Sequence, residues 1–281
     1  MKIIAHKEAL KSHIQSIKKQ GKQIGFVPTM GALHQGHLSL IEQSKQHCDY
    51  TVCSIFVNPT QFNDPEDFDK YPRSDAKDIA MLESIACDLL FLPELNEMYP
   101  EQDQRQFNFG NLETVMEGAH RPGHFNGVAQ IVSKLFDAVH PDKVFFGQKD
   151  FQQYVIIKSL VHQLKMPIEI IACPIIREQS GLAMSSRNQR LTEKEKGQAA
   201  NIYKILLEAK SNYRDYSPQS LKQKMFESLV QIDGLKPEYC EIVDDLELKP
   251  LNSWQTDQKI VACVAVFCGK VRLIDNIVFN L

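Results

Sequence analysis

Two histidines three residues apart, His34 and His37, stand in the segment 28–37, which reads PTMGALHQGH. The apolar run 24–27 before it predicts a buried strand, and the apolar-periodic stretch 38–46 after it predicts a helix. A glycine-containing turn between a strand and a helix directs backbone N–H groups and the positive end of the helix dipole at one point. We therefore expect this segment to bind a phosphate, with the two imidazoles supplying hydrogen-bond donors and movable positive charge.

On the residues alone, the two histidines have three interpretations. A histidine at a helix start can cap backbone groups. Two imidazoles at this spacing can also bind a metal ion, although such a site needs a third protein ligand and no nearby acidic cluster supplies one. In the third interpretation both imidazoles face the phosphates of a nucleotide and stabilise the charge that builds up during attack at the α-phosphate. Gly36 would then let the backbone approach the nucleotide closely.

Two further polar motifs directly follow predicted strands, and a third comes later in the chain. Residues 58–61 read NPTQ, residues 147–150 read GQKD, and residues 184–188 read MSSRN. Ligands of open parallel sheets bind outside the carboxyl ends of the strands. We therefore expect the segment 28–37 and the first two of these motifs to line one cleft.

These segments also have plainer interpretations. Lys149 and Asp150 could be an exposed pair at the start of a helix, with Asp150 as its N-cap. The segment 184–188 could be a surface turn, and Arg121, in a glycine-rich loop, could be a solvated cation. The acidic run 64–69 is better explained as a solvated loop than as a metal site.

The apolar patterns predict the fold that positions these motifs. Strand-like runs alternate with helical patterns through the first two thirds of the chain, and several runs are apolar throughout, as in strands covered on both faces. The strands are expected at 24–27, 51–57, 88–92, 143–146 and 168–172. The helices are expected at 7–20, 38–47, 75–86, 125–140 and 151–163. We therefore predict an α/β fold with a Rossmann-like parallel sheet that binds a nucleotide.

The pattern changes near residue 188. Helical patterns at 192–214 and 217–231 precede alternating or β-branched runs at 239–243, 259–267 and 270–280, which predicts a smaller α+β domain. We place the first domain at 1–187 and the second, which would close over the site, at 188–281.

Composition limits the function classes. With 281 residues, a formal charge of −3 and a pI near 6.3, the chain lacks the basic character of a protein whose main partner is nucleic acid. Seven scattered cysteines without a Cys-x-x-Cys pair indicate reduced thiols rather than a disulfide framework. Residues 1–22 hold no apolar core of signal-peptide length, and no run is long enough for a membrane span. We therefore expect a cytoplasmic protein with no membrane partner.

His-x-Gly-His between a strand and a helix is typical of adenylate-forming nucleotidyltransferases and class I aminoacyl-tRNA synthetases. The longer form PTMGALHQGH resembles the pantothenate synthetases (pantoate–β-alanine ligases). The segment 184–187 is similar to the Lys-Met-Ser-Lys-Ser loop of the class I synthetases, with Arg187 where they have lysine, as in pantothenate synthetases. The resemblance covers the whole chain, and four motifs match in order. It implies ligation of pantoate and β-alanine by ATP through pantoyl adenylate, with release of pyrophosphate and AMP.

The resemblance also implies roles for individual residues. The implied catalytic residues are His34, His37, Lys149 and Arg187. The substrate residues are Gln61 and Gln153, which would grip pantoate, and Arg121, which would line the pocket of pantoate or β-alanine. The implied ATP site consists of Met30, Gly31, Ala32, Leu33, His34, Gln35, Gly36, His37, Gly147, Gln148, Lys149, Asp150, Ile176, Met184, Ser185, Ser186 and Arg187.

The same resemblance implies Mg²⁺ bound mainly through the ATP phosphates, with no protein metal site, and a homodimer joined through the first domain, for which the strand 51–57 offers an edge. Three rival functions are open. A related adenylyltransferase would not need the paired glutamines, and a class I tRNA ligase would need an anticodon-binding domain and a basic face. A non-catalytic nucleotide sensor could lose His37 or the Ser-Ser-Arg loop, and this chain retains both.

Overall fold

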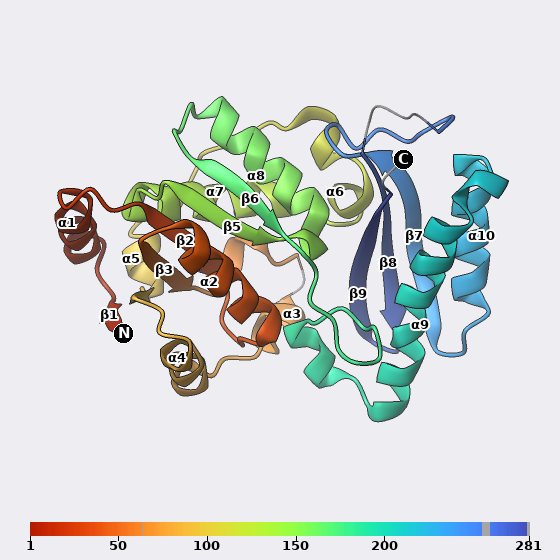
Figure 1. Cartoon of the computed structure of the whole chain (residues 1–281), viewed down its shortest axis with the longest axis horizontal. Helices are drawn as coiled ribbons and strands as arrows, with labels where there is room; N and C mark the ends of the chain where they lie inside the picture. Colours follow the sequence, from red (N-terminus) through yellow and green to blue (C-terminus); the bar gives the residue numbers. More distant parts are fainter. Residues whose placement is uncertain (64, 255–258, 280–281) are drawn as a thin grey trace.

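The computed structural model describes residues 1–63, 65–254 and 259–279, and its strands form two separate sheets (Figure 1). The first sheet is six-stranded and parallel throughout, in the order β1-β4-β3-β2-β5-β6. Its strands are β1 (Lys2–Ile4), β2 (Ile24–Thr29), β3 (Tyr50–Ile55), β4 (Leu89–Phe91), β5 (Lys143–Gly147) and β6 (Glu169–Cys173).

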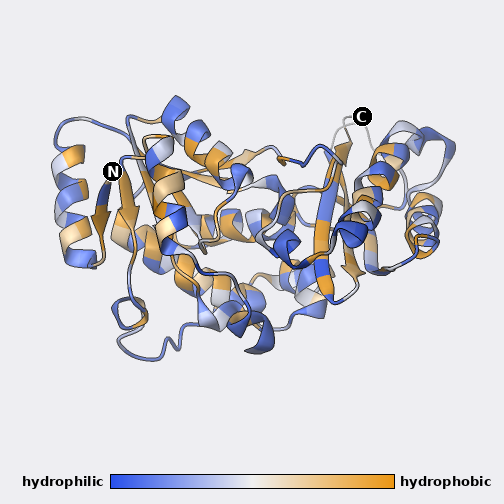
Figure 2. Cartoon of the chain, turned by 90° about the horizontal axis from the view of Figure 1, so that it is seen from below, coloured by the Kyte–Doolittle hydropathy of each residue, from blue (hydrophilic) through white to orange (hydrophobic). Residues whose placement is uncertain are grey.

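Helices cover both faces of this sheet because successive strand residues point to opposite sides. On one face α1 (Lys7–Lys18), α7 (His124–Val139) and α8 (Phe151–Gln163) pack on side chains such as Phe26 and Val144. On the other face α2 (Gln35–His47) and α4 (Asp75–Ser84) pack on neighbours such as Val27 and Phe145. Figure 2 shows the resulting hydrophobic interior along the strands.

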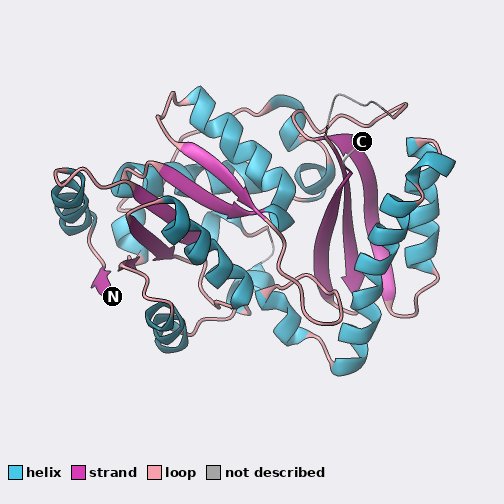
Figure 3. Cartoon of the chain, viewed as in Figure 1, coloured by secondary structure: helices cyan, strands magenta, loops and turns pink. Residues whose placement is uncertain are grey.

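The second sheet is antiparallel, in the order β7 (Leu235–Asp244), β8 (Ile260–Cys268) and β9 (Val271–Phe279). One face packs against α9 (Glu193–Ser211) and α10 (Pro218–Val230). The opposite face packs against residues of α6 (Met116–His120) and α8, so it joins the first sheet's helical layer (Figure 3). This contact places β9 beside the loops at the carboxyl edge of the first sheet.

The structure confirms the predicted α/β class with a parallel sheet and a smaller C-terminal α+β part. The sequence patterns missed β1 and the short helices α3 (Pro65–Asp69), α5 (Leu95–Met98) and α6. The proposed dimer edge at 51–57 is wrong, because β3 pairs with β2 on one side and β4 on the other. The last residue of the predicted strand 270–280 lies outside the described residues. Among the described helices, none is both long and apolar enough to cross a membrane.

Candidate active site

The two histidines share one hydrogen-bonding arrangement at the start of α2. His34 is the N-cap, and its Nδ1 accepts the N–H of Gly36 at 3.1 Å. The Nδ1 of His37 in turn accepts the N–H of His34 at 3.3 Å. Because a backbone N–H can only donate, both Nδ1 atoms are unprotonated, and each neutral ring carries its proton on Nε2. The capping interpretation therefore holds for Nδ1, while Nε2–H is left as a donor for another group.

Both imidazoles are neutral near pH 7. Burial lowers the pKa of His34 to about 4, and the nearby Lys149 ammonium adds to this effect. Burial also lowers the pKa of His37 far below its usual value, with further contributions from His34 and Lys149. The two ring centres lie 4.0 Å apart. The pair thus offers two fixed N–H donors with little tendency to take up a proton.

A buried carboxylate that sequence reasoning missed holds the preceding turn in place. Asp78, from α4, is 1% exposed and accepts the N–H groups of Ala32 and Leu33, each at 2.8 Å. Gly31 has a φ of +76°, and a Cβ there would come within 3.0 Å of the same carboxylate. Asp78 therefore already receives two of the backbone donors that we expected to face ATP.

The carboxyl ends of the strands border a cavity of about 210 Å³. Fourteen of the expected site residues line it, and they come from segments far apart in the sequence. They are Met30, His34, Gly36, His37, Gln61, Gly147, Lys149, Asp150, Gln153, Ile176, Met184, Ser185, Ser186 and Arg187. The expected residues Gly31, Ala32, Leu33, Gln35, Gln148 and Arg121 are not among its lining residues. The rest of the wall is largely apolar and includes Val128, Ile131 and Leu135 of α7, which the periodicity indicates only as core.

Hydrogen bonds from His124 and Arg121 fix the backbone carbonyl of Gln61. The Nδ1 of His124 bonds to the Gln61 carbonyl at 2.7 Å, and a guanidinium N–H of Arg121 donates to the same oxygen at 3.3 Å. Since the carbonyl can only accept, His124 carries its proton on Nδ1, and its Nε2 accepts from Arg121 at 3.2 Å. Burial lowers the pKa of His124 to about 3. Arg121 itself lines the neighbouring cavity rather than the one beside the histidines.

The side chain of Gln61 lies in the cavity wall. Its Oε1 accepts from Asn58 at 3.2 Å, and its Nε2 lies 3.0 Å from the sulfur of Met30. The segment sits tightly against α7, because a Cβ on Gly127 would lie 2.3 Å from the carbonyl oxygen of Thr60. Gln61 is thus held at both its backbone and its side chain.

Arg187 forms an ion pair with an acidic residue of α3. It donates to Asp67 at 2.7 Å, and Arg190 donates to the other oxygen of that carboxylate at 2.9 Å. The neighbouring Ser186 hydroxyl lies 3.3 Å from the phenolic oxygen of Tyr71. We expected the run 64–69 to be a solvated loop, and this is wrong for its described residues, because 65–69 form α3 and Asp67 holds two guanidinium groups. Residue 64 lies outside the described residues. The segment 184–188 is likewise packed rather than a free surface turn.

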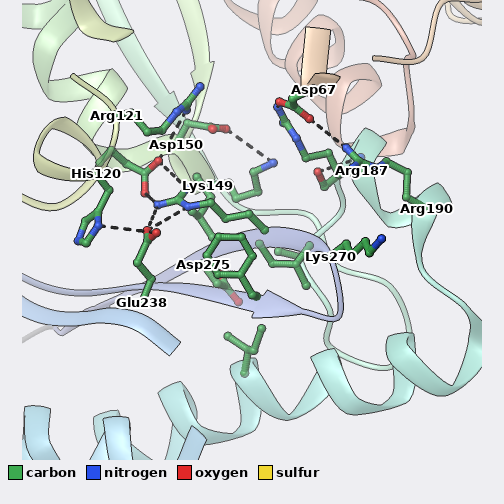
Figure 4. A pocket seen from close by; sticks show the side chains of 18 of the residues that line it. Asp67, His120, Arg121, Lys149, Asp150, Arg187, Arg190, Glu238, Lys270 and Asp275 are labelled. Carbon is green, nitrogen blue, oxygen red and sulfur yellow. Dashed lines mark hydrogen bonds and ion pairs between the residues drawn. The ribbon is translucent and has the colours of Figure 1, made fainter. Parts of the chain in front are cut away.

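A second, charged cavity of about 380 Å³ adjoins the first and shares Lys149, Asp150, Ser185 and Arg187 with it. Figure 4 shows Arg121 and Asp150 on one side of it and Asp67, with Arg187 and Arg190, on the other. Lys149 lies 3.8 Å from the Asp150 carboxylate, and Asp150 precedes α8 without a side-chain capping hydrogen bond. Asp150 thus occupies the N-cap position of α8, as its plainer interpretation predicts, but its side chain does not cap the helix.

A buried ion-pair network joins α6 to the second sheet beside this cavity. Glu117 of α6 receives two hydrogen bonds of 2.8 Å from Arg272 of β9, which also binds Glu238 of β7 at 2.6 Å. Tyr239 donates to Glu117 at 2.8 Å. No group of three or more His, Cys, Asp or Glu side chains within the described ranges is arranged to hold a metal ion.

Comparisons with known proteins agree with this geometry. A family model described as Pantoate-beta-alanine ligase matches residues 2–278. A pantothenate synthetase of Porphyromonas gingivalis is 49% identical over 280 residues, covering 100% of both chains. The crystal structure of a pantothenate synthetase from Thermus thermophilus has a TM-score of 0.92 at 37% identity and covers 99% of each chain.

A Francisella tularensis pantoate-beta-alanine ligase, complexed with beta-gamma ATP and beta-alanine, has a TM-score of 0.81 at 36% identity and covers 99% of this chain and 97% of its own. These matches span nearly the full length of both partners, so they do not rest on the segment 28–37 alone. They confirm the resemblance that the PTMGALHQGH segment indicates. The chain belongs to the pantoate-beta-alanine ligase family.

Proposed function

We propose that the protein joins pantoate and β-alanine to give pantothenate, with ATP consumed to AMP and pyrophosphate through a pantoyl-adenylate intermediate. One observation carries this proposal. A single cavity is lined by two neutral Nε2–H imidazoles, by the cations Lys149 and Arg187, and by an amide side chain held in place, that of Gln61. These are the groups that an attack of a carboxylate on a triphosphate requires.

In the first step an oxygen of the pantoate carboxylate forms a bond to the α-phosphorus. The bond from that phosphorus to the bridging oxygen breaks, and pyrophosphate leaves with the electron pair. His34 and His37 donate from Nε2 to oxygens on which charge develops, and fixed donors in a water-poor site stabilise such charge strongly. Lys149 and Arg187 hold the β- and γ-phosphates. Gln61 and Gln153 orient pantoate without the charge that would make its carboxylate less nucleophilic.

In the second step the neutral amine of β-alanine attacks the acyl carbon of the adenylate. A C–N bond forms, the C–O bond to the phosphate breaks, AMP leaves with the electron pair, and the amine proton passes to solvent. The second, charged cavity adjoins the first and gives the incoming molecule a path, and Arg121 in its wall offers a guanidinium to the β-alanine carboxylate. Of the two domains that we propose, 1–187 binds ATP and pantoate, and 188–281 closes the site.

The residues present fit a magnesium ion that is held by substrate. Asp150 is the one carboxylate among the residues that line the cavity next to the histidines, within the part of the chain that the structure describes. Mg²⁺ commonly keeps several waters and uses one or two carboxylates together with substrate phosphates. Bound mainly through the phosphates of ATP, it would neutralise their charge, and Asp150 would be the carboxylate available to it. We further propose that the enzyme is a cytoplasmic homodimer.

A pyrophosphate-release assay tests the proposal. ATP and pantoate without β-alanine should release about one pyrophosphate per site, because the adenylate stays bound; addition of β-alanine should give continuous turnover and pantothenate. Release that needs a phosphorylated acceptor instead of pantoate would indicate an adenylyltransferase. Binding of ATP with no release under any of these conditions would indicate a nucleotide sensor.

A further inference from the structure

Two consecutive residues of β9 tie the second sheet to loops of the first. Asn276 donates from Nδ2 to the carbonyl oxygens of Gln148 and Lys149, each at 2.9 Å. Its neighbour Asp275 accepts from Arg177, in the loop after β6, at 2.6 and 2.9 Å. Asn276 is 2% exposed, so both bonds are shielded from water. The second sheet therefore holds the loop that carries Lys149.

Stability alone does not explain an asparagine at this position. Of the two ends of the Asn276 amide, the NH₂ group must face the two carbonyl oxygens, because Oδ1 cannot donate. This orientation leaves Oδ1 buried without a hydrogen-bond partner among the described residues. A buried acceptor without a partner is destabilising. The side chain thus retains an unfavourable group in order to keep two donors aimed at the backbone on either side of the Lys149 peptide.

The position of that backbone governs the catalytic cavity. Residues 148–150 form a single 3₁₀ turn between β5 and α8, so two fixed carbonyls restrain most of it. Lys149 lines the cavity with His34 and His37 and is close enough for its charge to act on both imidazoles. A shift of the turn would move the ammonium relative to both rings.

We propose that Asn276 is a positioning residue for adenylate formation: it fixes the Gln148–Lys149 carbonyls so that the Lys149 ammonium meets the ATP phosphates. The inference rests on the proposed function. It makes the second sheet necessary for the first chemical step through contacts with the backbone of the catalytic turn.

Two variants of Asn276 test the proposal, with one matched control. Asn276→Asp keeps the shape and removes the NH₂ donor, and Asn276→Leu also removes the unpartnered oxygen, which limits loss of stability. Tyr239→Phe removes another buried hydrogen bond of the second sheet, from β7 to Glu117 of α6, and leaves the two bonds to the turn in place. Both Asn276 variants should slow pyrophosphate release from ATP and pantoate by about tenfold or more and raise the KM for ATP, because a misplacement near 1 Å can cost about 10²-fold. Tyr239→Phe should stay within about twofold of the natural protein.

Two further measurements separate positioning from a general structural role. The reaction of pre-formed pantoyl adenylate with β-alanine should change little in the Asn276 variants. In a Lys149→Ala background, Asn276→Asp should have almost no further effect, since both changes act through one ammonium. Equal slowing of both half-reactions, or full additivity with Lys149→Ala, would overturn the proposal. Failure of the proposed function would be seen separately, as no pyrophosphate release by the natural protein.

Discussion

Substitutions at His37 can separate its two hydrogen-bonding atoms. Nδ1 accepts the backbone N–H of His34, while Nε2 is the proposed donor to the reacting phosphate. The amide of asparagine lies about where Nδ1 lies in histidine, and the amide of glutamine lies about where Nε2 lies. Asparagine therefore keeps an acceptor for the backbone and loses the donor in the cavity. Glutamine retains a donor in the cavity and loses the backbone acceptor, and alanine loses both.

The expected loss of stability and the expected loss of rate differ enough to be measured separately. Loss of one capping acceptor lowers the free energy of unfolding by about 1 kcal/mol. Loss of a donor to developing charge raises the barrier by about 2.7–4 kcal/mol, or 10²–10³ in kcat. We expect His37→Asn to be as stable as the natural protein but slower by about 10²–10³ in pyrophosphate release. His37→Gln should be less stable and lose much less activity, and His37→Ala should show both defects.

Single-turnover pyrophosphate release and urea unfolding measure these two quantities on the same preparations. Because the histidine is buried, a folding defect could lower the rate of any variant, and the unfolding curves control for this. The assignment fails if His37→Asn releases pyrophosphate at a nearly natural rate, or if the rates of the three variants follow their stabilities.

Four further predictions concern substrates, charge and assembly. Gln153→Ala should raise the KM for pantoate far more than that for ATP, by about 1–3 kcal/mol in binding; equal effects on both KM values would show that the assignment of Gln153 to the pantoate subsite is wrong. Asp67→Asn should lower the KM for ATP up to about fivefold, because it frees Arg187 from a partly exposed ion pair worth about 1 kcal/mol; a higher KM would mean that Asp67 helps to aim Arg187. The folded-state pKa of His34, about 4, lies below its unfolded value near 6.5, so its contribution to stability is complete above pH 6.5 and is lost as the pH falls toward 4, by on the order of 3 kcal/mol; His34→Gln should reduce the fall of the urea midpoint over that range, and the part that remains belongs to His37 and His124. Light scattering at micromolar concentration should give twice the chain mass of 32.1 kDa, and a value near the chain mass would exclude the dimer.

The parallel sheet could be predicted because its strands carry their own local signal. Runs such as 143–146 are apolar on both faces, and each is followed by a turn and a helical pattern. β1 gives no such signal, since it is three residues long and, among the described strands, pairs with β4 alone. Its place at the sheet edge depends on a partner 87 positions away in the register Lys2↔Leu89, which no local pattern encodes.

The residues of the candidate site likewise include some with a local sequence signal and some without one. Residues that would touch substrate stand in compact motifs at strand ends, so their types and order could be interpreted directly. The residues that hold those motifs in place do not stand in motifs of this kind. Asp78 is 46 positions from Ala32, Asp67 is 120 from Arg187, and Asn276 is 127 from Lys149. Each is one common polar residue on an ordinary helix or strand, and only the folded chain shows what it binds.

The charges of the site suggest why its histidines are kept neutral. Arg187 faces Asp67, and Lys149 lies beside Asp150, so both cations have carboxylate partners. Two protonated imidazoles 4.0 Å apart would add fixed, mutually repelling charge beside Lys149. Burial prevents this and leaves the rings as neutral donors held by the backbone. In the mechanism that we propose, a triphosphate then replaces the carboxylate partners of the cations, while the donors at the α-phosphate need no rearrangement.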